Sequence, residues 1–135
     1  MSYVAWDESL DVGVKTFNDD HRTLVGFINE LHSGLVSGLG IAKMTHILEG
    51  LVDYTEKHFS REEKLMQEYG YPQYEKHRSA HQNLMAQVAD FKARLQSGEK
   101  TFSLELMAFL RDWLVNHIKG TDMVYKDFFK DKGVR

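Results

Sequence analysis

The sequence predicts an all-α protein, an up-down-up-down four-helix bundle with an N-terminal arm and a short C-terminal helix. Three observations lead to this prediction. The 135 residues contain one proline, Pro72, so long segments run without a helix breaker. In four segments apolar residues recur at alternating spacings of three and four, the period of one helix face. Short loops separate these segments, so they close on each other more simply than they form an open array of α-hairpins.

The first helix is expected to follow an arm formed by residues 1–17. Asn18, Asp19 and Asp20 supply capping side chains and acidic groups for its first turn. The glycine-rich stretch 34–40 ends the helix and makes a turn. The inward positions are His21, Leu24, Ile28, Leu31 and Leu35.

The second and third helices show the same spacing. The inward positions of the second are Met44, Leu48, Leu51, Thr55, His58, Glu62, Leu65 and Tyr69. The stretch "YGYP" closes it, and Pro72 suits the first turn of the next helix. The inward positions of the third are His77, His81, Leu84, Val88, Phe91 and Leu95, and the helix is expected to end at "QSGEK", residues 96–100.

The fourth helix completes a bundle that spans about residues 18–119. Its inward positions are Leu106, Leu110, Trp113 and His117. The tail, residues 120–135, is expected to add a helical turn or two through Val124, Phe128 and Phe129. A chain of this length suits one domain, so we expect residues 1–135 to form a single one.

Composition excludes several classes of function. A net charge of −3 gives no basic stripe for nucleic acid, and the absence of cysteine excludes disulfides, thiolate catalysis and iron–sulfur clusters. No apolar run approaches the roughly 20 residues that span a bilayer, and the N-terminus does not resemble a signal peptide. We therefore expect a cytoplasmic protein with no membrane insertion, a monomer rather than a large oligomer.

Polar residues interrupt the apolar stripes at one end of the predicted bundle. They are His21, His58, Glu62, His77, His81 and His117, with Asp122 five residues beyond the last. They fall early in the odd-numbered helices and late in the even-numbered ones, so alternating helix directions bring them together. A buried polar group without a partner costs roughly 1–3 kcal/mol. Five such histidines would cost about 5–15 kcal/mol, which is the whole net stability of a domain.

Metal ions satisfy such a set, because imidazole nitrogens and carboxylate oxygens are their ligands. Five imidazoles and two carboxylates are too many for one ion. If both carboxylates and one oxygen atom bridge two roughly octahedral ions, the ligands fill eleven of about twelve positions. The ion with two histidines keeps a vacant position where a small molecule can bind. Iron suits this coordination and cycles between two oxidation states, whereas zinc prefers about four ligands.

The ligand pattern resembles the hemerythrin family, in particular its bacterial single-domain form, bacteriohemerythrin. The pattern is His21, His58-x-x-x-Glu62, His77-x-x-x-His81 and His117-x-x-x-x-Asp122. The likeness extends over the whole chain, including Trp6 in the arm and the "DDHR" stretch around His21. It implies a non-haem di-iron centre that binds dioxygen reversibly.

The resemblance also implies a role for each ligand. His77, His81 and His117 would hold one iron, His21 and His58 the other, and Glu62 and Asp122 would bridge both. Dioxygen would bind the ion with the vacant position and be held as a hydroperoxide, with both irons ferric and the proton taken from the hydroxo bridge. Apolar residues beside the histidines are expected to wall this pocket and exclude water: Phe59, Trp113, Leu114 and Ile118.

Three functions remain open at this point. A dioxygen carrier, store or scavenger is favoured, because oxygen-activating bundles use Glu-x-x-His motifs and more carboxylates than this chain has. It would deliver dioxygen to an oxygen-consuming enzyme as its recipient. A di-iron redox enzyme, such as a peroxidase or a nitric-oxide-handling protein, is the alternative. An oxygen or redox sensor is the third. His32 and His46 fall off the stripes and are expected on the surface.

Overall fold

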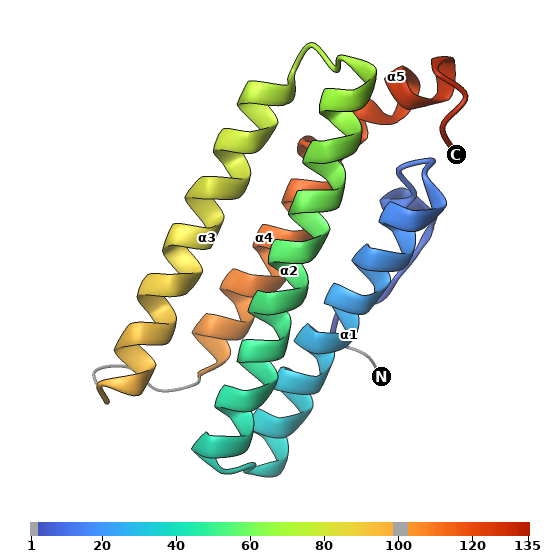
Figure 1. The fold of residues 1–135 in the computed structure, drawn as a ribbon. Helices are drawn as coiled ribbons and strands as arrows, with labels where there is room; N and C mark the ends of the chain where they lie inside the picture. The colour runs from blue at the N-terminus through green and yellow to red at the C-terminus, as the bar shows by residue number, and fades with distance from the viewer. Residues whose placement is uncertain (1–2, 99–102) are drawn as a thin grey trace.

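The computed structural model describes residues 3–98 and 103–135, and these residues form helices and turns without any strand. The long helices are α1 (Lys15–Ser37), α2 (Ile41–Tyr69), α3 (Tyr74–Gln96) and α4 (Leu104–Gly120). They run alternately up and down, and the N-terminal arm lies beside α1 (Figure 1). α1 packs against α2 and α4, and α2 packs against α3. The all-α prediction is confirmed.

Three shorter elements extend the bundle. They are η1 (Glu8–Leu10) in the arm, and η2 (Asp122–Tyr125) and α5 (Lys126–Asp131) in the tail. The tail is therefore helical, as expected. Phe129 is fully buried and packs against Phe17 of α1, whereas Val124 is exposed. α5 lies across the end of the bundle at which α2 meets α3 (Figure 1).

The helix ends depend on the turn residues that the sequence offers. Gly38 ends α1 and Gly70 ends α2, both with a positive φ that glycine adopts without strain. The Ser103 side chain accepts a hydrogen bond from the Leu106 amide and caps α4. Of the stretch expected to end α3, residues 99–100 lie outside the described residues, and α3 itself ends at Gln96.

Two predictions about helix starts are wrong. α1 begins at Lys15, and its N-cap residue is Val14, whose side chain cannot accept a hydrogen bond. Val14 and Phe17 are both buried, so this earlier turn packs against the core. The Asn18 side chain instead accepts a hydrogen bond from the Val12 amide and so ties down the arm. Pro72 lies in the turn before α3 rather than in its first turn.

The inward faces agree with most of the predicted stripes, but five predicted positions are not fully buried. Two of them are Leu35 of α1 and Phe91 of α3, which are half-buried. On α2 the stripe passes from Glu62 to the buried Met66, whereas Leu65 is half-buried and Tyr69 is exposed. On α4 Trp113 is half-buried, whereas its neighbour Leu114 is fully buried. An α-helix has 3.6 residues per turn, so a strict alternation of three and four drifts off the face. None of the helices among the described residues is long and apolar enough to cross a membrane.

Candidate metal centre

The seven polar residues predicted to converge do so. They come from the last turns of α2 and α4, the first turns of α1 and α3, and η2, so they lie toward the end of the bundle that carries the α2–α3 turn. Each is buried, and the most exposed, His117, has an exposed fraction of 8%. Bulk water therefore cannot satisfy these side chains, and their partners must lie within the cluster.

The ligand atoms form two overlapping groups. We call Glu62, His77, His81, His117 and Asp122 the three-histidine group, and His21, His58, Glu62 and Asp122 the two-histidine group. Within each group, one ligand atom from every residue lies within 4.8 Å of all the others. The two carboxylates belong to both groups, so each group could hold one metal ion with the carboxylates between them.

Glu62 turns a different oxygen to each group. Its Oε1 lies 3.1 Å from His77 Nε2 and 3.3 Å from His81 Nε2, both of the three-histidine group. Its Oε2 lies 3.1 Å from His58 Nε2 and 3.6 Å from His21 Nε2. A carboxylate with one oxygen facing each set of imidazoles is oriented as a bridge.

Asp122 is arranged in the same way. Its Oδ1 lies 3.1 Å from His77 Nε2 and 3.2 Å from His117 Nε2, and its Oδ2 lies 3.0 Å from His21 Nε2. α4 ends at Gly120, and the chain then turns through Thr121 into η2. This change of direction carries Asp122 into the cluster. In a continuous helix a residue five positions after His117 would lie on a different face, because a turn takes 3.6 residues.

The cluster holds an unusual number of buried polar atoms without a hydrogen-bond partner among the described residues. These atoms are His21 Nδ1 and Nε2, His58 Nε2, His81 Nε2, His117 Nε2, and both carboxylate oxygens of Asp122. Folded proteins rarely leave such atoms unsatisfied. Nitrogen and oxygen atoms with free lone pairs, aimed at one another around two points, fit a pair of metal ions.

The electrostatics of the cluster favour positive charge. Burial lowers the pKa of His58, but the charge of Glu62 and a hydrogen bond to Asp20 outweigh burial and raise it to about 10. Burial likewise lowers the pKa of His77, and contacts with Asp122 and Glu62 raise it to about 9. Burial raises the pKa of Glu62, yet the surrounding histidines hold it well below its usual range. A metal cation would supply the same positive charge in place of the protons.

Aromatic rings cover the outer side of the three-histidine group. The Phe59 ring stacks on the His81 imidazole at a centroid distance of 3.6 Å and an angle of 4°. The Trp113 ring stacks on His117 at 5.2 Å and 21°. These two contacts hold imidazole planes in place and separate them from solvent.

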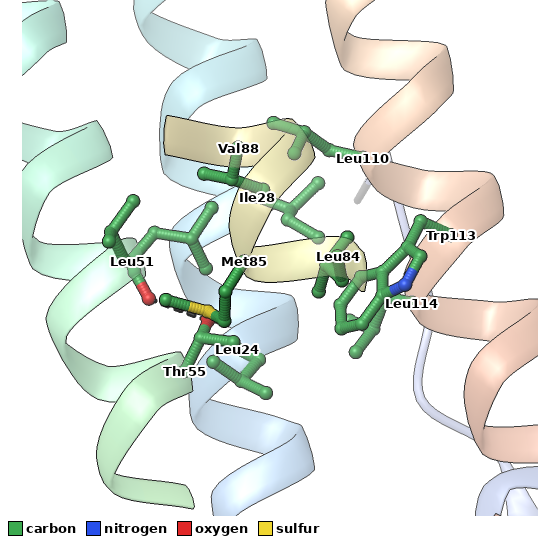
Figure 2. Close-up of a pocket in the computed structure, with 11 residues that line it drawn as sticks. Leu24, Ile28, Leu51, Thr55, Leu84, Met85, Val88, Leu110, Trp113 and Leu114 are labelled. Carbon is green, nitrogen blue, oxygen red and sulfur yellow. Dashed lines mark hydrogen bonds between the residues drawn. The ribbon is translucent and has the colours of Figure 1, made fainter. Parts of the chain in front are cut away.

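A largely enclosed apolar cavity of about 20 Å³ lies one helical turn from the cluster (Figure 2). Its lining includes Leu24, Thr55, Leu84 and Leu114, each three residues from a clustered histidine on its own helix. The Thr55 hydroxyl is occupied, because it donates to the Leu51 carbonyl. Such a volume accepts about one water-sized molecule and offers it almost no polar partner.

The four residues expected to wall a pocket lie in different surroundings. Trp113 and Leu114 line the cavity. Phe59 stacks on His81 and also contacts Trp113 edge-on, at a centroid distance of 6.0 Å. Ile118 is fully buried in the main core. Leu24, Thr55 and Leu84 were not expected at the cavity, although their spacing from the histidines could have indicated them.

Sequence reasoning also missed the partners of the clustered residues. His58 Nδ1 contacts Asp20, and His81 Nδ1 contacts Glu63. The fully buried Tyr125 donates its hydroxyl hydrogen to Glu62 Oε2 at 2.8 Å. Asp20 and Glu63 each adjoin a clustered residue in the chain, which was the available signal.

The two histidines that were not assigned to the cluster lie outside it. His46 is exposed, as expected. His32 is half-buried, because its ring stacks on Tyr3 of the arm at a centroid distance of 4.0 Å.

Comparisons with known proteins agree with this architecture. The hemerythrin HHE cation binding domain family matches residues 12–129. A bacteriohemerythrin of Stenotrophomonas maltophilia is 36% identical over 96% of this chain and 84% of its own. A bacteriohemerythrin of Methylococcus capsulatus is 33% identical over 93% of both chains, and a myohemerythrin of Theromyzon tessulatum is 31% identical over 90% and 89%.

A solved structure shows that the likeness extends to three dimensions. The crystal structure of a wild-type hemerythrin superposes with a TM-score of 0.88 at 31% identity, covering 93% of this chain and 97% of the other. The sequence match, the superposition and the paired carboxylates among five histidines agree with one another. The chain belongs to the hemerythrin family.

Proposed function

We propose that the chain binds dioxygen reversibly at a pair of iron ions. The two overlapping ligand groups carry this proposal, since seven of their buried nitrogen and oxygen atoms have no hydrogen-bond partner among the described residues. His77, His81 and His117 would hold one ion, and His21 and His58 the other. When bound, the iron pair supplies the exchangeable electrons and the vacant coordination position that reversible dioxygen binding needs.

The protein's part is to hold the ligands and to keep water away. Glu62 and Asp122 would each help to hold both ions, because each has one oxygen that faces the three-histidine group and one that faces the two-histidine group. The three-histidine group offers one imidazole more than the two-histidine group, so a small molecule would bind at the ion that the two-histidine group would hold. This asymmetry gives small molecules one defined place to bind.

The surrounding side chains suit dioxygen rather than a polar ligand. Trp113 and Leu114 form part of the apolar cavity next to the cluster, the Phe59 ring covers His81 of α3, and Ile118, the neighbour of His117 in the chain, is fully buried in the core. A small apolar molecule can enter such a space, whereas water loses its hydrogen bonds there and therefore seldom carries protons in. Their exclusion would slow irreversible oxidation of the iron.

The physiological role that we propose is transport, storage or delivery of dioxygen. Relatives are named bacteriohemerythrin and myohemerythrin, which favours an oxygen-binding role over an enzymatic one. An oxygen-consuming enzyme as recipient, a monomeric state and a cytoplasmic location remain predictions.

The test uses purified protein loaded anaerobically with ferrous iron. We expect about two iron atoms per chain, new visible absorption on exposure to air, and return to the colourless state when oxygen is removed. Repeated cycles without loss of amplitude would support a carrier. Irreversible oxidation that requires a reductant for each turnover would support the redox enzyme instead.

A further inference from the structure

Asp20 connects the two-histidine group to the surface of the protein. It lies on α1, one residue before His21, and its exposed fraction is 4%. Its Oδ2 lies 2.8 Å from His58 Nδ1 on α2. The carboxylate therefore contacts the imidazole nitrogen that faces away from Glu62. Asp20 itself is not one of the seven clustered residues.

Two further side chains of α2 hold this carboxylate. Arg61 donates from Nε to Oδ2 at 3.0 Å and from Nη2 to Oδ1 at 2.7 Å, which is a bidentate pair. The Tyr54 hydroxyl donates to Oδ1 at 2.8 Å. Burial raises the pKa of Asp20, but the hydrogen bonds from His58, Arg61 and Tyr54 outweigh burial and hold it well below its usual range. The side chain of Arg61 is 41% exposed, so the network reaches the solvent.

The contact determines which nitrogen of His58 is free. A carboxylate at 2.8 Å accepts the proton on Nδ1, so when a metal ion takes the place of the second proton, Nε2 would be the nitrogen that offers its lone pair toward Glu62 and the cluster. Phe17 packs edge-on against the same ring at 5.9 Å. His21, the other imidazole of this group, has no hydrogen-bond partner for either nitrogen within the described part of the chain. Of the two imidazoles in this group, only that of His58 has a hydrogen-bond partner among the described residues, and Asp20 orients it.

The equivalent contact in the three-histidine group is looser. Glu63 Oε2 lies 3.1 Å from His81 Nδ1, and the nearest guanidinium nitrogen, Arg78 Nε, lies 3.8 Å from its other oxygen. The side chain of Glu63 is 22% exposed, whereas that of Asp20 is 6% exposed. Water can therefore replace part of the contact that Glu63 makes with His81, but it has little access to Asp20.

We propose that Asp20 is a positioning residue for the iron ion of the two-histidine group, and that Arg61 sets how strongly its carboxylate polarises His58. This inference rests on the proposed di-iron function. A carboxylate that accepts the Nδ1 proton makes Nε2 a stronger ligand and favours the ferric state. A bidentate guanidinium draws charge from the carboxylate and weakens that effect. The exposed Arg61 would thereby act on the ion at which dioxygen binds.

The experiment compares Asp20→Asn, Arg61→Met and Asp19→Asn with the wild type. Asp19 is the matched control, because it is the preceding acid on α1 and pairs with Lys15 at the surface. Anaerobic titration with ferrous iron should show one of the two ions bound about 10–100-fold more weakly by Asp20→Asn. The fraction of ferric protein that binds azide, a probe anion for the vacant position, should fall with that ion. Asp19→Asn should behave like the wild type.

The reduction potential of the iron pair separates positioning from a structural role. Asp20→Asn should raise it, because His58 becomes a weaker donor, and Arg61→Met should lower it, because the carboxylate keeps more of its charge. A loss of fold cannot shift the potential in opposite directions. The inference would be overturned if Asp20→Asn bound both ions with wild-type affinity, or if it lost one ion and still bound azide fully. It would also be overturned if the reduction potentials of Asp20→Asn and Arg61→Met shifted in the same direction. Failure of the wild type to load two ions would instead contradict the proposed function.

Discussion

Shortening Leu114 to alanine should leave the iron content unchanged and should speed irreversible oxidation of the iron. Leu114 is 1% exposed, lines the apolar cavity and lies one turn before His117. Its side chain coordinates nothing, so the ligands stay in place. Its removal widens the space next to the cluster, and water that enters there can carry protons to the site.

The structure sets the size of the effect. A buried leucine shortened to alanine loses about 2–5 kcal/mol of unfolding free energy, and the loss grows with the volume of the cavity that remains. The existing cavity of about 20 Å³ accepts about one water molecule, so the widened space accepts more. A domain with a net stability near the middle of the usual range of about 5–15 kcal/mol remains folded after this loss.

Leu110→Ala provides the matched comparison. Leu110 lines the same cavity and is 4% exposed, but it lies one turn farther from His117. Both variants should lose similar stability in chemical denaturation, whereas the decay of the oxygenated absorption should accelerate more in Leu114→Ala. Equal acceleration in both variants, or none in Leu114→Ala, would refute the idea that water exclusion beside the cluster protects the iron.

Three further predictions follow from the same geometry. Removal of iron by a chelator under reducing conditions should lower the melting temperature, since an ion present at 100 times its Kd adds about 2.7 kcal/mol per site; an unchanged melting temperature would contradict metal stabilisation. Glu62→Gln should lose iron from both groups, because each of its oxygens faces one of them; elemental analysis that finds the full iron content would exclude bridging. Tyr125→Phe should cost about 1.5–3 kcal/mol, because a buried hydrogen bond to a charged group is lost. Tyr71→Phe, a buried tyrosine for which no such bond is present among the described residues, should cost less in the same denaturation assay.

Local and periodic information was sufficient for the fold and for the convergence of the cluster. Four apolar stripes and the turn glycines Gly38 and Gly70 predicted the long helices, and the alternating helix directions predicted that the polar interruptions would meet. The same reasoning was wrong at positions where contacts with distant parts of the chain determine what a side chain does. Asn18 and Asp20 look like capping residues in the sequence, but the arm takes the first and α2 takes the second.

The sequence by itself determined which residues gather at one end of the bundle, because helical period and chain direction suffice to place a side chain on a face and at a height. Only the tertiary structure decided how these residues face one another. Which oxygen of Glu62 turns to which imidazole, the pairing of Asp20 with His58 and Arg61, and the cavity beside Leu114 depend on rotamers and on distances between helices. Those quantities result from the packing of all four helices together, and no short stretch of sequence contains them.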